Sequence, residues 1–269
     1  MSALGDLPVL ILCGGLGTRL LPVLADRPKA LAPIAGRPFL ELQIGLLRDQ
    51  GARHFVLCVG HRAAQVREEF GDGSRLGVRI DYSIEGDRLL GTGGAIRLAE
   101  RFFDPAAVVV NGDTYLDVDH NRVVRHHALA RQESGVLATL TLARLEDARR
   151  YGTVDLDPAG QFVTGFREKD ETAAARPGWL NAGAYVIERE LLDRVPPGKV
   201  RSVERDVFPA ALRDGCRIAA LTCDRPFYDI GTPEDLRAFI GRHEELRHAS
   251  QGAVNGSGPA TPVARQPRG

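Results

Sequence analysis

Short apolar runs alternate with amphipathic segments along the first 113 residues. Runs made mainly of Val, Leu, Ile, Phe and Cys are typical of buried strands in a parallel sheet. We predict strands over 9–12, 54–59, 78–84 and 107–110. Apolar residues at helical spacing predict helices over 38–51, 63–70 and 95–103. This alternation of strands and helices predicts an α/β protein with a doubly wound sheet.

The second half of the chain is richer in strands. We predict strands over 136–142, 153–156, 162–166, 179–187, 218–222 and 227–230. We predict helices over 119–132, near 191, over 203–213 and over 232–248. Thr232 is expected to cap the last helix, because Pro233 follows it and Asp235 stands three residues on. Residues 249–269 lack large apolar side chains, so we expect a disordered tail.

A glycine-rich segment, Gly14-Gly15-Leu16-Gly17-Thr18-Arg19, follows the first predicted strand. Glycines there allow a tight turn whose N–H groups can face an anion, although a plain turn is the alternative. Arg19 and Lys29 add positive charge, which suits a polyphosphate. The spacing lacks the G-x-G-x-x-G pattern, since Leu20 replaces the last glycine, and it lacks G-x-x-x-x-G-K-[ST]. We therefore expect charged side chains to assist the backbone in binding phosphate.

Composition and net charge argue against nucleic acid and membranes as partners. The formal net charge is zero, so no overall field attracts nucleic acid or an acidic membrane. No apolar run approaches the roughly 20 residues of a membrane span, and the first residues lack a signal-peptide pattern. The four cysteines form no C-x-x-C pair, and Cys13 and Cys58 fall in apolar segments. We expect a reduced, cytoplasmic protein without nucleic-acid or membrane partners.

Two aspartates end predicted strands, Asp113 after 107–110 and Asp229 within 227–230. Ligands of open α/β sheets lie at the carboxyl ends of strands. Each aspartate could cap the next turn or hold a metal, and together they suit one Mg²⁺ with phosphates as further ligands. Asp117 and Asp119 resemble the D-x-D metal pair of glycosyltransferases, but their place before a predicted helix favours turn and cap chemistry.

In chain order, these motifs resemble those of the sugar-1-phosphate nucleotidyltransferases, also called sugar-nucleotide pyrophosphorylases. The matching segments are Gly14-Gly15-Leu16-Gly17-Thr18-Arg19, Pro28-Lys29, Leu90-Gly91-Thr92-Gly93-Gly94-Ala95, Asn111-Gly112-Asp113, Tyr151-Gly152-Thr153-Val154, Phe166-Arg167-Glu168-Lys169, Asn181-Ala182-Gly183 and Asp229-Ile230-Gly231-Thr232-Pro233. The resemblance covers roughly residues 8 to 245. Within the family, the chain is most similar to guanylyltransferases acting on D-glycero-D-manno-heptose 1-phosphate, with mannose-1-phosphate guanylyltransferases next.

The resemblance implies a fold, a domain organisation and a set of roles. The fold would be a Rossmann-like doubly wound mixed sheet flanked by helices, with a small β-rich insertion on the sugar side: the nucleotide-diphospho-sugar transferase fold. One domain would span 1–248, with a nucleotide half over about 8–113 and a sugar half over about 114–248. The implied catalytic residues are Arg19, Lys29 and Lys169, and the implied Mg²⁺ ligands are Asp113 and Asp229. The implied nucleotide-binding residues are Gly14, Gly15, Gly17, Thr18, Glu85, Gly91 and Thr92, and the implied sugar-binding residues are Asn111, Gly112, Gly152, Glu168 and Asn181.

The implied reaction transfers a nucleotidyl group, with GMP from GTP favoured, to a sugar 1-phosphate. The sugar-phosphate oxygen is already an anion, so the in-line displacement needs no general base, and the protein must align two anions and neutralise the departing pyrophosphate. Glu85 favours guanine, because a carboxylate can accept hydrogen bonds from both N1–H and the N2 amino group. Uridylyl and thymidylyl members of the family often place a glutamine there. A solvated loop glutamate is the alternative interpretation of Glu85.

Three other functions are weighed against this one. The chain could be a uridylyltransferase acting on N-acetylmuramate 1-phosphate or a related sugar phosphate. It could be a catalytically silent module that binds sugar nucleotides, although Arg19, Lys29 and Asp113 are all present. A glycosyltransferase that uses Asp117 and Asp119 is opposed by the glycine–arginine–lysine segment. The identity of the sugar, allosteric control and assembly into a homo-oligomer stay open.

Overall fold

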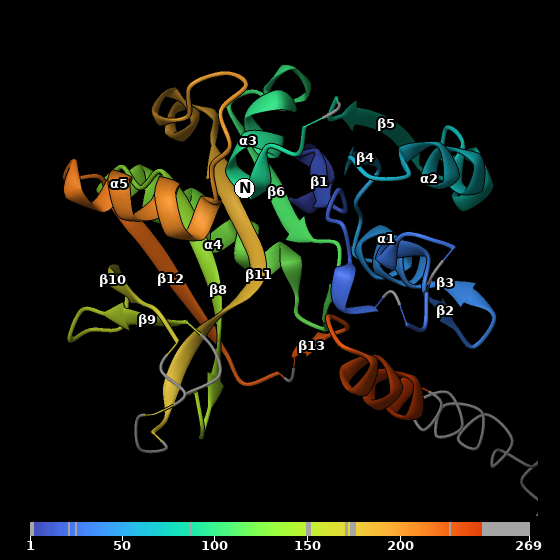
Figure 1. The fold of residues 1–269 in the computed structure, drawn as a ribbon. Helices are drawn as coiled ribbons and strands as arrows, with labels where there is room; N and C mark the ends of the chain where they lie inside the picture. Colours follow the sequence, from blue (N-terminus) through green and yellow to red (C-terminus); the bar gives the residue numbers. More distant parts are fainter. Residues whose placement is uncertain are drawn as a thin grey trace, which may run out of the picture.

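The computed structural model describes residues 3–243 apart from 21, 25, 87, 149–151, 170–171, 173–175 and 226. Its core is a mixed sheet in which nine strands of the described residues are joined (Figure 1). The predicted α/β class is therefore confirmed. No helix in the described ranges is both long and apolar enough to cross a membrane. The predicted tail, 249–269, and Tyr151 lie outside the described residues.

Four parallel strands build the first part of the sheet. They are β1 (Val9–Leu12), β4 (His54–Val59), β5 (Arg79–Ile84) and β6 (Ala106–Asn111), in the spatial order β6-β1-β4-β5. The predicted bounds of β1 and β4 are confirmed to the residue, because each strand coincides with a mostly apolar run that a glycine follows closely. In the register of β1 and β6, Leu12 lies beside Asn111. The glycine segment after β1 and the Asn111-Gly112-Asp113 segment after β6 therefore leave the sheet side by side.

The long strand β11 (Gly178–Glu188) joins the second half of the chain to this sheet, because it pairs antiparallel with β6. The other strands that this half adds to the main sheet are β8 (Ala138–Leu145), β9 (Thr153–Leu156), β10 (Val163–Arg167) and β12 (Ile218–Cys223). Strands β9 and β10 form a hairpin that meets β11 where Val154 lies opposite Trp179. This hairpin is the β-rich insertion that the family resemblance implied.

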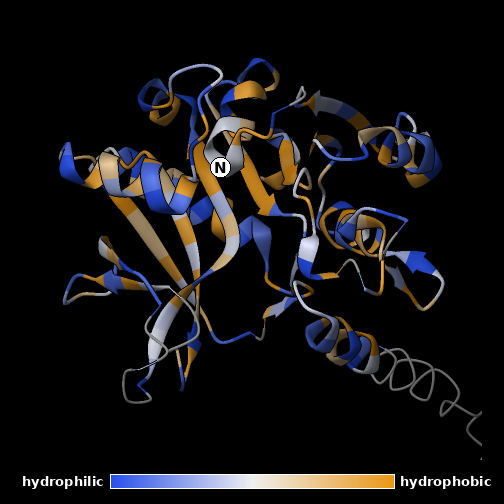
Figure 2. Ribbon diagram, viewed as in Figure 1, coloured by the Kyte–Doolittle hydropathy of each residue, from blue (hydrophilic) through white to orange (hydrophobic). Residues whose placement is uncertain are grey.

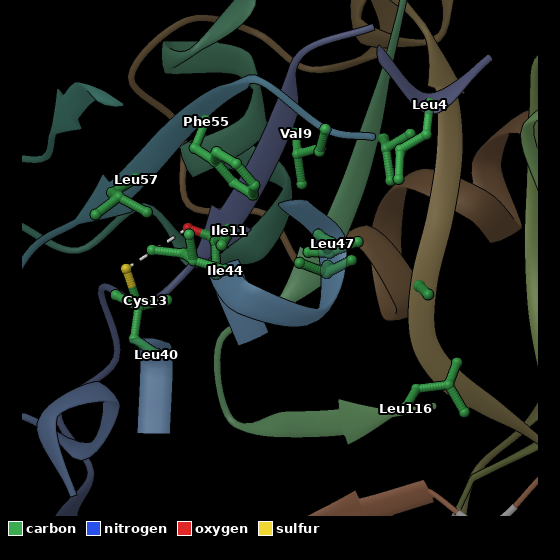
Figure 3. Close-up of a cluster of buried hydrophobic side chains, with 14 of the residues drawn as sticks. Leu4, Val9, Ile11, Cys13, Leu40, Ile44, Leu47, Phe55, Leu57 and Leu116 are labelled. Atoms are coloured by element: carbon green, nitrogen blue, oxygen red, sulfur yellow. Dashed lines mark hydrogen bonds between the residues drawn. The ribbon is translucent and has the colours of Figure 1, made fainter. Parts of the chain in front are cut away.

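Two hydrophobic clusters cover the two faces of the sheet. The first lies under α1 (Phe39–Asp49), α2 (Ala63–Phe70) and α4 (His120–Ser134), and the second under α3 (Gly91–Leu98) and α5 (Phe208–Arg213). Hydrophobic residues, orange in Figure 2, make up much of the central strands, and the helices carry both hydrophobic and hydrophilic residues. In the first cluster, Ile11 of β1 packs among side chains of α1 and β4, and the Cys13 thiol donates to the Ile11 carbonyl at 3.6 Å (Figure 3). Burial raises the pKa of Cys13 to about 12, so this thiol stays protonated.

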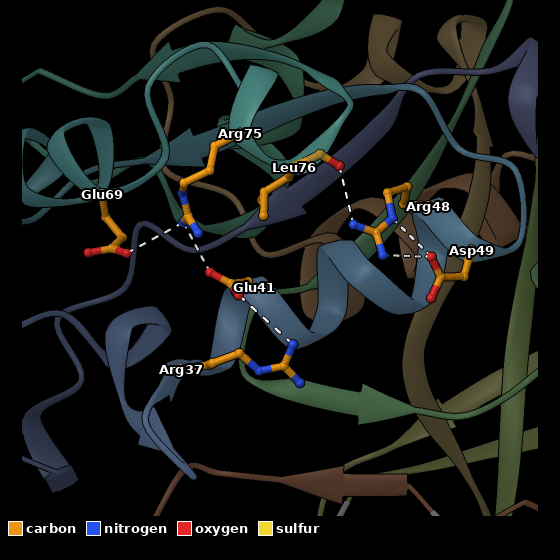
Figure 4. A network of polar contacts seen from close by, with 7 residues as sticks. All are labelled: Arg37, Glu41, Arg48, Asp49, Glu69, Arg75 and Leu76. Atoms are coloured by element: carbon orange, nitrogen blue, oxygen red, sulfur yellow. Dashed lines mark hydrogen bonds and ion pairs between the residues drawn. The ribbon is translucent and has the colours of Figure 1, made fainter.

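A surface network of charged side chains fixes α1 against its neighbours (Figure 4). Glu41 of α1 pairs with Arg37 at 4.0 Å and with Arg75 at 3.0 Å. Arg48, near the other end of α1, donates to the Leu76 carbonyl at 3.2 Å. Exposed pairs of this kind contribute about 1 kcal/mol or less each, so we assign them a role in orienting α1 and little role in stability.

Three predicted helices differ from the structure, and the one near residue 191 is a 3-10 helix, Arg189–Arg194. The helix predicted over 95–103 is α3, which starts at Gly91, ends at Leu98 and is followed by a 3-10 turn over Glu100–Phe102. The glycines belong to this helix because they let it pack closely on another segment: the N–H of Gly93 donates to the Arg201 carbonyl at 2.8 Å. The helix predicted over 203–213 divides into a π-helical turn, η7 (Val203–Val207), and α5.

Two pairs of very short strands were only partly predicted. Strands β2 (Pro33–Ile34) and β3 (Arg37–Pro38) form a small hairpin before α1. Strand β7 (Thr114–Leu116) pairs antiparallel with β13 (Phe227–Asp229) and was not predicted, because three residues carry too short a pattern. Only β13 of these four strands was expected from the sequence.

The last helix of the described part covers residues 233–243. Its predicted cap is confirmed: the Thr232 hydroxyl accepts the Asp235 N–H at 3.2 Å and donates to the Asp235 carboxylate at 2.7 Å. Phe239 is 2% exposed and packs on Phe39 and Tyr115, with ring centroids 5.3 and 5.2 Å away. The helix therefore covers the β7–β13 pair from outside.

We expect Phe239→Ala to destabilise the protein by about 3–5 kcal/mol, because the substitution empties a packed aromatic site. The free energy of unfolding in urea measures this. Leu129→Ala is the matched control, because Leu129 is 55% exposed on α4, and it should change stability by less than about 0.5 kcal/mol. Equal stability of both variants would show that the last helix does not belong to the cooperative core.

Candidate active site

A cleft of about 430 Å³ opens at the carboxyl ends of β1 and β6. Its walls include many of the residues that the sequence singled out: Gly14, Gly15, Gly17, Lys29, Glu85, Gly91, Thr92, Asn111, Gly112 and Asp113. A second hollow of about 280 Å³ lies beside it and is lined by Gly152, Glu168 and Asn181, among others. Glu204 and Arg205 line both, so the two hollows adjoin at these residues.

Two glycines allow the walls of the cleft to approach each other. The N–H of Gly112 donates to the Leu12 carbonyl at 3.0 Å, and a Cβ at residue 112 would lie 2.8 Å from that oxygen. A Cβ at Gly14 would lie 2.5 Å from Oε2 of Glu85. Any side chain at either position would force the backbone or its neighbours to move. The segments after β1 and β6 are thus packed backbone against backbone.

Lys29 and Asp113 meet across this contact. Lys29 Nζ donates to Asp113 Oδ2 at 2.6 Å, with the two side chains 17% and 32% exposed. Gln43 of α1, which sequence reasoning missed, braces the segment that carries Asp113. Its Nε2 donates to the carbonyls of Asn111 and Thr114 at 2.9 and 2.6 Å. No pattern marks Gln43, because it falls inside the apolar stripe of α1.

The β7–β13 pair brings the second predicted metal ligand beside the first. Asp229 lies opposite Thr114 in this pair, and the Ile230 N–H donates to the Asp113 carbonyl at 2.9 Å. The Asp229 carboxylate accepts the N–H of Gly231. Burial raises the pKa of Asp229, and the charge of Asp113 raises it further, while Lys29 acts in the opposite direction.

This carboxylate pair suits a divalent cation that takes few protein ligands. Within the described ranges, no group of three or more His, Cys, Asp or Glu side chains is placed to hold a metal. Mg²⁺ commonly binds one or two carboxylates and completes its octahedron with phosphate oxygens and water. The mutual repulsion of Asp113 and Asp229 would be relieved by such an ion. The residues present therefore fit Mg²⁺.

Four predicted residues lie outside the walls of the two hollows: Thr18, Arg19, Lys169 and Asp229. Arg19, in the turn Thr18–Leu20, is exposed, and its guanidinium lies 3.4 Å from the Cβ position of Gly231. Arg19 therefore lies beside the segment that follows Asp229. Lys169 is exposed next to Glu168.

Glu85 is part of the cleft wall. It is 7% exposed, which contradicts the interpretation as a solvated loop residue. Its Oε1 accepts the Leu90 N–H at 2.6 Å, while Oε2 faces Gly14 and Gly60. Burial raises the pKa of Glu85, and the bond from Leu90 partly offsets this. A carboxylate is thus held at a fixed place inside the cleft.

Asp119, the second residue of the Asp117 and Asp119 pair, has the capping role that its position favoured. The Asp119 carboxylate accepts the Arg122 N–H at 3.2 Å and so caps α4. It also pairs with Arg125 at 3.2 Å. Neither aspartate lines the two hollows described above.

Sequence reasoning missed a polar network around Glu204 of the π-helical turn η7. Glu204 Oε1 accepts hydrogen bonds from Asn181 Nδ2 at 2.6 Å and from the Tyr185 hydroxyl at 3.0 Å. Asn181 Oδ1 in turn accepts the Gly183 N–H at 3.0 Å. Burial raises the pKa of Glu204, and the charge of Asp113 adds to this. In the sequence, Glu204 looks like any acidic residue in the first turn of a helix, here the turn that Ser202 caps, so nothing marks it as functional.

Comparisons with known proteins identify similar sequences and a similar crystal structure. A sequence profile described as "Nucleotidyl transferase" matches residues 8–244. The chain is 40% identical to a mannose-1-phosphate guanylyltransferase of Mycobacterium tuberculosis, over 84% of this chain and 61% of that protein's length. It is 36% identical to a D-glycero-alpha-D-manno-heptose 1-phosphate guanylyltransferase of Campylobacter jejuni, over 86% of this chain and 97% of the relative. The fold is similar to the crystal structure of HddC from Yersinia pseudotuberculosis complexed with GMP-PN, with a TM-score of 0.74. The two sequences are 29% identical, and the match covers 88% of this chain and 99% of that one.

We expect Asp229→Asn to stabilise the metal-free protein at neutral pH, because Asn keeps an acceptor for the Gly231 N–H and removes the repulsion with Asp113. The raised pKa means that native protein binds this proton more tightly than unfolded protein does. Wild-type stability therefore falls as the pH rises through that raised pKa, and the advantage of the variant should vanish at acidic pH.

Urea unfolding in EDTA at a series of pH values tests this. Asp224→Asn, at an exposed aspartate, is the matched control and should change stability by less than about 0.5 kcal/mol. A destabilised Asp229→Asn variant at neutral pH would contradict the expected charge repulsion.

Proposed function

This chain belongs to the nucleotidyl transferase family, and we propose that it transfers GMP from GTP to a sugar 1-phosphate, giving a GDP-sugar and pyrophosphate. The sheet and its helices have the nucleotide-diphospho-sugar transferase fold of the similar structures. The observation that carries the proposal is the meeting of Lys29, Asp113 and Asp229 at the carboxyl ends of β1 and β6. It supports the proposal because a cation and two carboxylates that would hold a metal lie close together where a triphosphate could enter.

The glycine segment and two cations would hold the triphosphate. Backbone N–H groups of Gly14, Gly15 and Gly17 would face its phosphates, with Thr18 beside them. Lys29, which lines the cleft, and Arg19, which lies beside Gly231, would neutralise the pyrophosphate as it departs. Asp113 and Asp229 would hold Mg²⁺, which when bound offsets charge on the phosphates.

The bond changes are those of an in-line displacement. An oxygen of the sugar phosphate forms a bond to the α-phosphorus, and the bond from that phosphorus to the bridging oxygen breaks, leaving the electron pair on pyrophosphate. The attacking oxygen is already an anion, so no side chain has to remove a proton. The protein contributes alignment and charge neutralisation, which bring two mutually repelling anions together.

Glu85 supports guanine as the base. A carboxylate only accepts hydrogen bonds, and guanine presents two donors, N1–H and the N2 amino group, along one edge. Glu85 lines the cleft together with Gly91 and Thr92, and its Oε2 lies against Gly14 and Gly60. Uracil presents one donor between two acceptors on the matching edge, so it would leave a carboxylate oxygen opposed to a carbonyl.

The hollow beside the cleft would take the sugar. Glu168 and Gly152 line it, and Lys169 follows Glu168. Asn111 and Gly112 line the adjoining cleft beside Asp113. A charged glutamate suits sugar hydroxyls and a lysine suits the sugar phosphate. We favour D-glycero-D-manno-heptose 1-phosphate, with mannose 1-phosphate next, because the heptose relative is matched over 97% of its length.

Pyrophosphate release with Mg²⁺ tests the proposal. GTP, UTP, dTTP, CTP and ATP are each paired with heptose 1-phosphate, mannose 1-phosphate and N-acetylmuramate 1-phosphate. Release with GTP and the heptose substrate, well above mannose, supports the proposal in full. Release only with UTP keeps the reaction class and rejects guanine. No release with any pair favours a silent sugar-nucleotide-binding module.

We expect Lys29→Ala and Asp113→Ala each to lower kcat/KM by at least about 100-fold. The first removes a positive charge that would offset the phosphates, and the second removes a carboxylate that would hold the metal. Both variants should stay folded, which thermal unfolding checks. Lys199→Ala is the matched control, since Lys199 is exposed and outside both hollows. Wild-type turnover by either active-site variant would reject the site assignment.

We expect Glu85→Gln to lower the ratio of kcat/KM for GTP to that for UTP by about 10- to 100-fold, because a glutamine offers one acceptor and one donor set in place of two acceptors. Steady-state kinetics with one sugar 1-phosphate and both nucleotides measures the ratio. An unchanged ratio would mean that Glu85 does not read the base.

A further inference from the structure

We propose that Glu204 selects the sugar by accepting a hydrogen bond from the hydroxyl on C2 of the sugar 1-phosphate. The inference rests on the proposed function and adds to it the feature of the sugar that is read. It assigns a substrate-contacting role to a side chain that stands outside the motifs of the glycine segment, the aspartate pair and the Glu168-Lys169 pair.

The position of Glu204 is the first argument. Its side chain lines both the nucleotide cleft and the adjoining hollow, and it is exposed to this space. Asp113 lines the same cleft as Glu204, so the phosphate side of the site adjoins this carboxylate. A sugar 1-phosphate that spans the two hollows would place its anomeric carbon, where phosphate joins sugar, next to this carboxylate.

The way in which Glu204 is held is the second argument. Asn181 and Tyr185 both donate to Oε1, at 2.6 and 3.0 Å. Tyr185 is fully buried in β11, and Asn181 is fixed by the Gly183 N–H, so this anchor is rigid. No hydrogen bond joins Oε2 to any of the described residues. One oxygen of the carboxylate is thus immobilised, and the other stays available as an acceptor.

The chemistry of the sugar identifies the donor. The anomeric carbon has two ring neighbours, the ring oxygen and C2. The ring oxygen carries no proton, and a carboxylate can only accept, so these two cannot bond. The C2 hydroxyl is the donor nearest to the phosphate. A hydrogen bond to a charged acceptor in a cleft discriminates strongly against an analogue without the donor, by about 10- to 100-fold.

A purely structural role for Glu204 is the competing explanation. The carboxylate could serve only to hold Asn181 and Tyr185, which would support the wall of the hollow. Loss of such a brace would affect every sugar 1-phosphate equally. Loss of a C2 contact would affect only substrates that carry the C2 hydroxyl, so a ratio of two substrates separates the explanations.

The experiment compares mannose 1-phosphate with 2-deoxyglucose 1-phosphate, which differs from it only by the missing C2 hydroxyl. The nucleotide is the one that the wild-type protein uses best. We expect wild-type kcat/KM to favour mannose 1-phosphate by about 10- to 100-fold. In Glu204→Ala the preference should fall to within about 3-fold of unity. Glu204→Gln, which keeps the shape of the side chain, should lower the same ratio by a smaller factor and serves if the alanine variant does not fold.

Two further variants complete the design. Glu133→Ala removes an exposed carboxylate of α4 and should keep the wild-type ratio. Tyr185→Phe removes one anchor of Oε1 and should lower the ratio without abolishing it. A wild-type protein that uses both substrates equally, or a Glu204→Ala variant that loses both equally, overturns this inference while the proposed function stands. Failure of the wild-type protein with every nucleotide and sugar 1-phosphate overturns both.

Discussion

The close packing of two backbone segments at the carboxyl ends of β1 and β6 is the constraint on which the site depends. The N–H of Gly112 bonds to the Leu12 carbonyl, and no Cβ fits at residue 112. Because the segments touch, Lys29 from one side reaches Asp113 from the other at 2.6 Å. Gln43 fixes the far side of the same segment through two carbonyls. A larger residue at position 112 would separate these groups.

The close packing of these segments also brings several carboxyl groups together, and this raises their pKa values. Burial raises the pKa values of Glu85, Asp229 and Glu204, and Asp113 raises the latter two further. Carboxylates gathered in this way repel the polyanionic substrates that the family acts on, and the chain as a whole carries no net charge to compensate. Local cations must therefore supply the attraction. Lys29, Arg19 and the Mg²⁺ for which Asp113 and Asp229 are suited would do so.

Much of the sheet and part of the site could be predicted from local sequence. The strands β1 and β4 were predicted to the residue because buried parallel strands consist of uninterrupted apolar runs. The glycine segment was recognisable because it follows such a run. The β7–β13 pair was not, since three-residue strands carry no periodicity and their partners are far apart in sequence. Gln43 and Glu204 were missed for a related reason: each stands in an ordinary helical context, and only tertiary contacts give it a role.

A crystal structure with Mg²⁺ and a non-hydrolysable GTP analogue tests the account most directly. We expect the guanine edge on the Glu85 carboxylate, the phosphates along Gly14 to Gly17 with Lys29 upon them, and the metal between Asp113 and Asp229. Lys29 would then bond to phosphate as well as, or in place of, Asp113. A nucleotide whose base lies away from Glu85, or whose metal contacts neither aspartate, would contradict the assignment of the site.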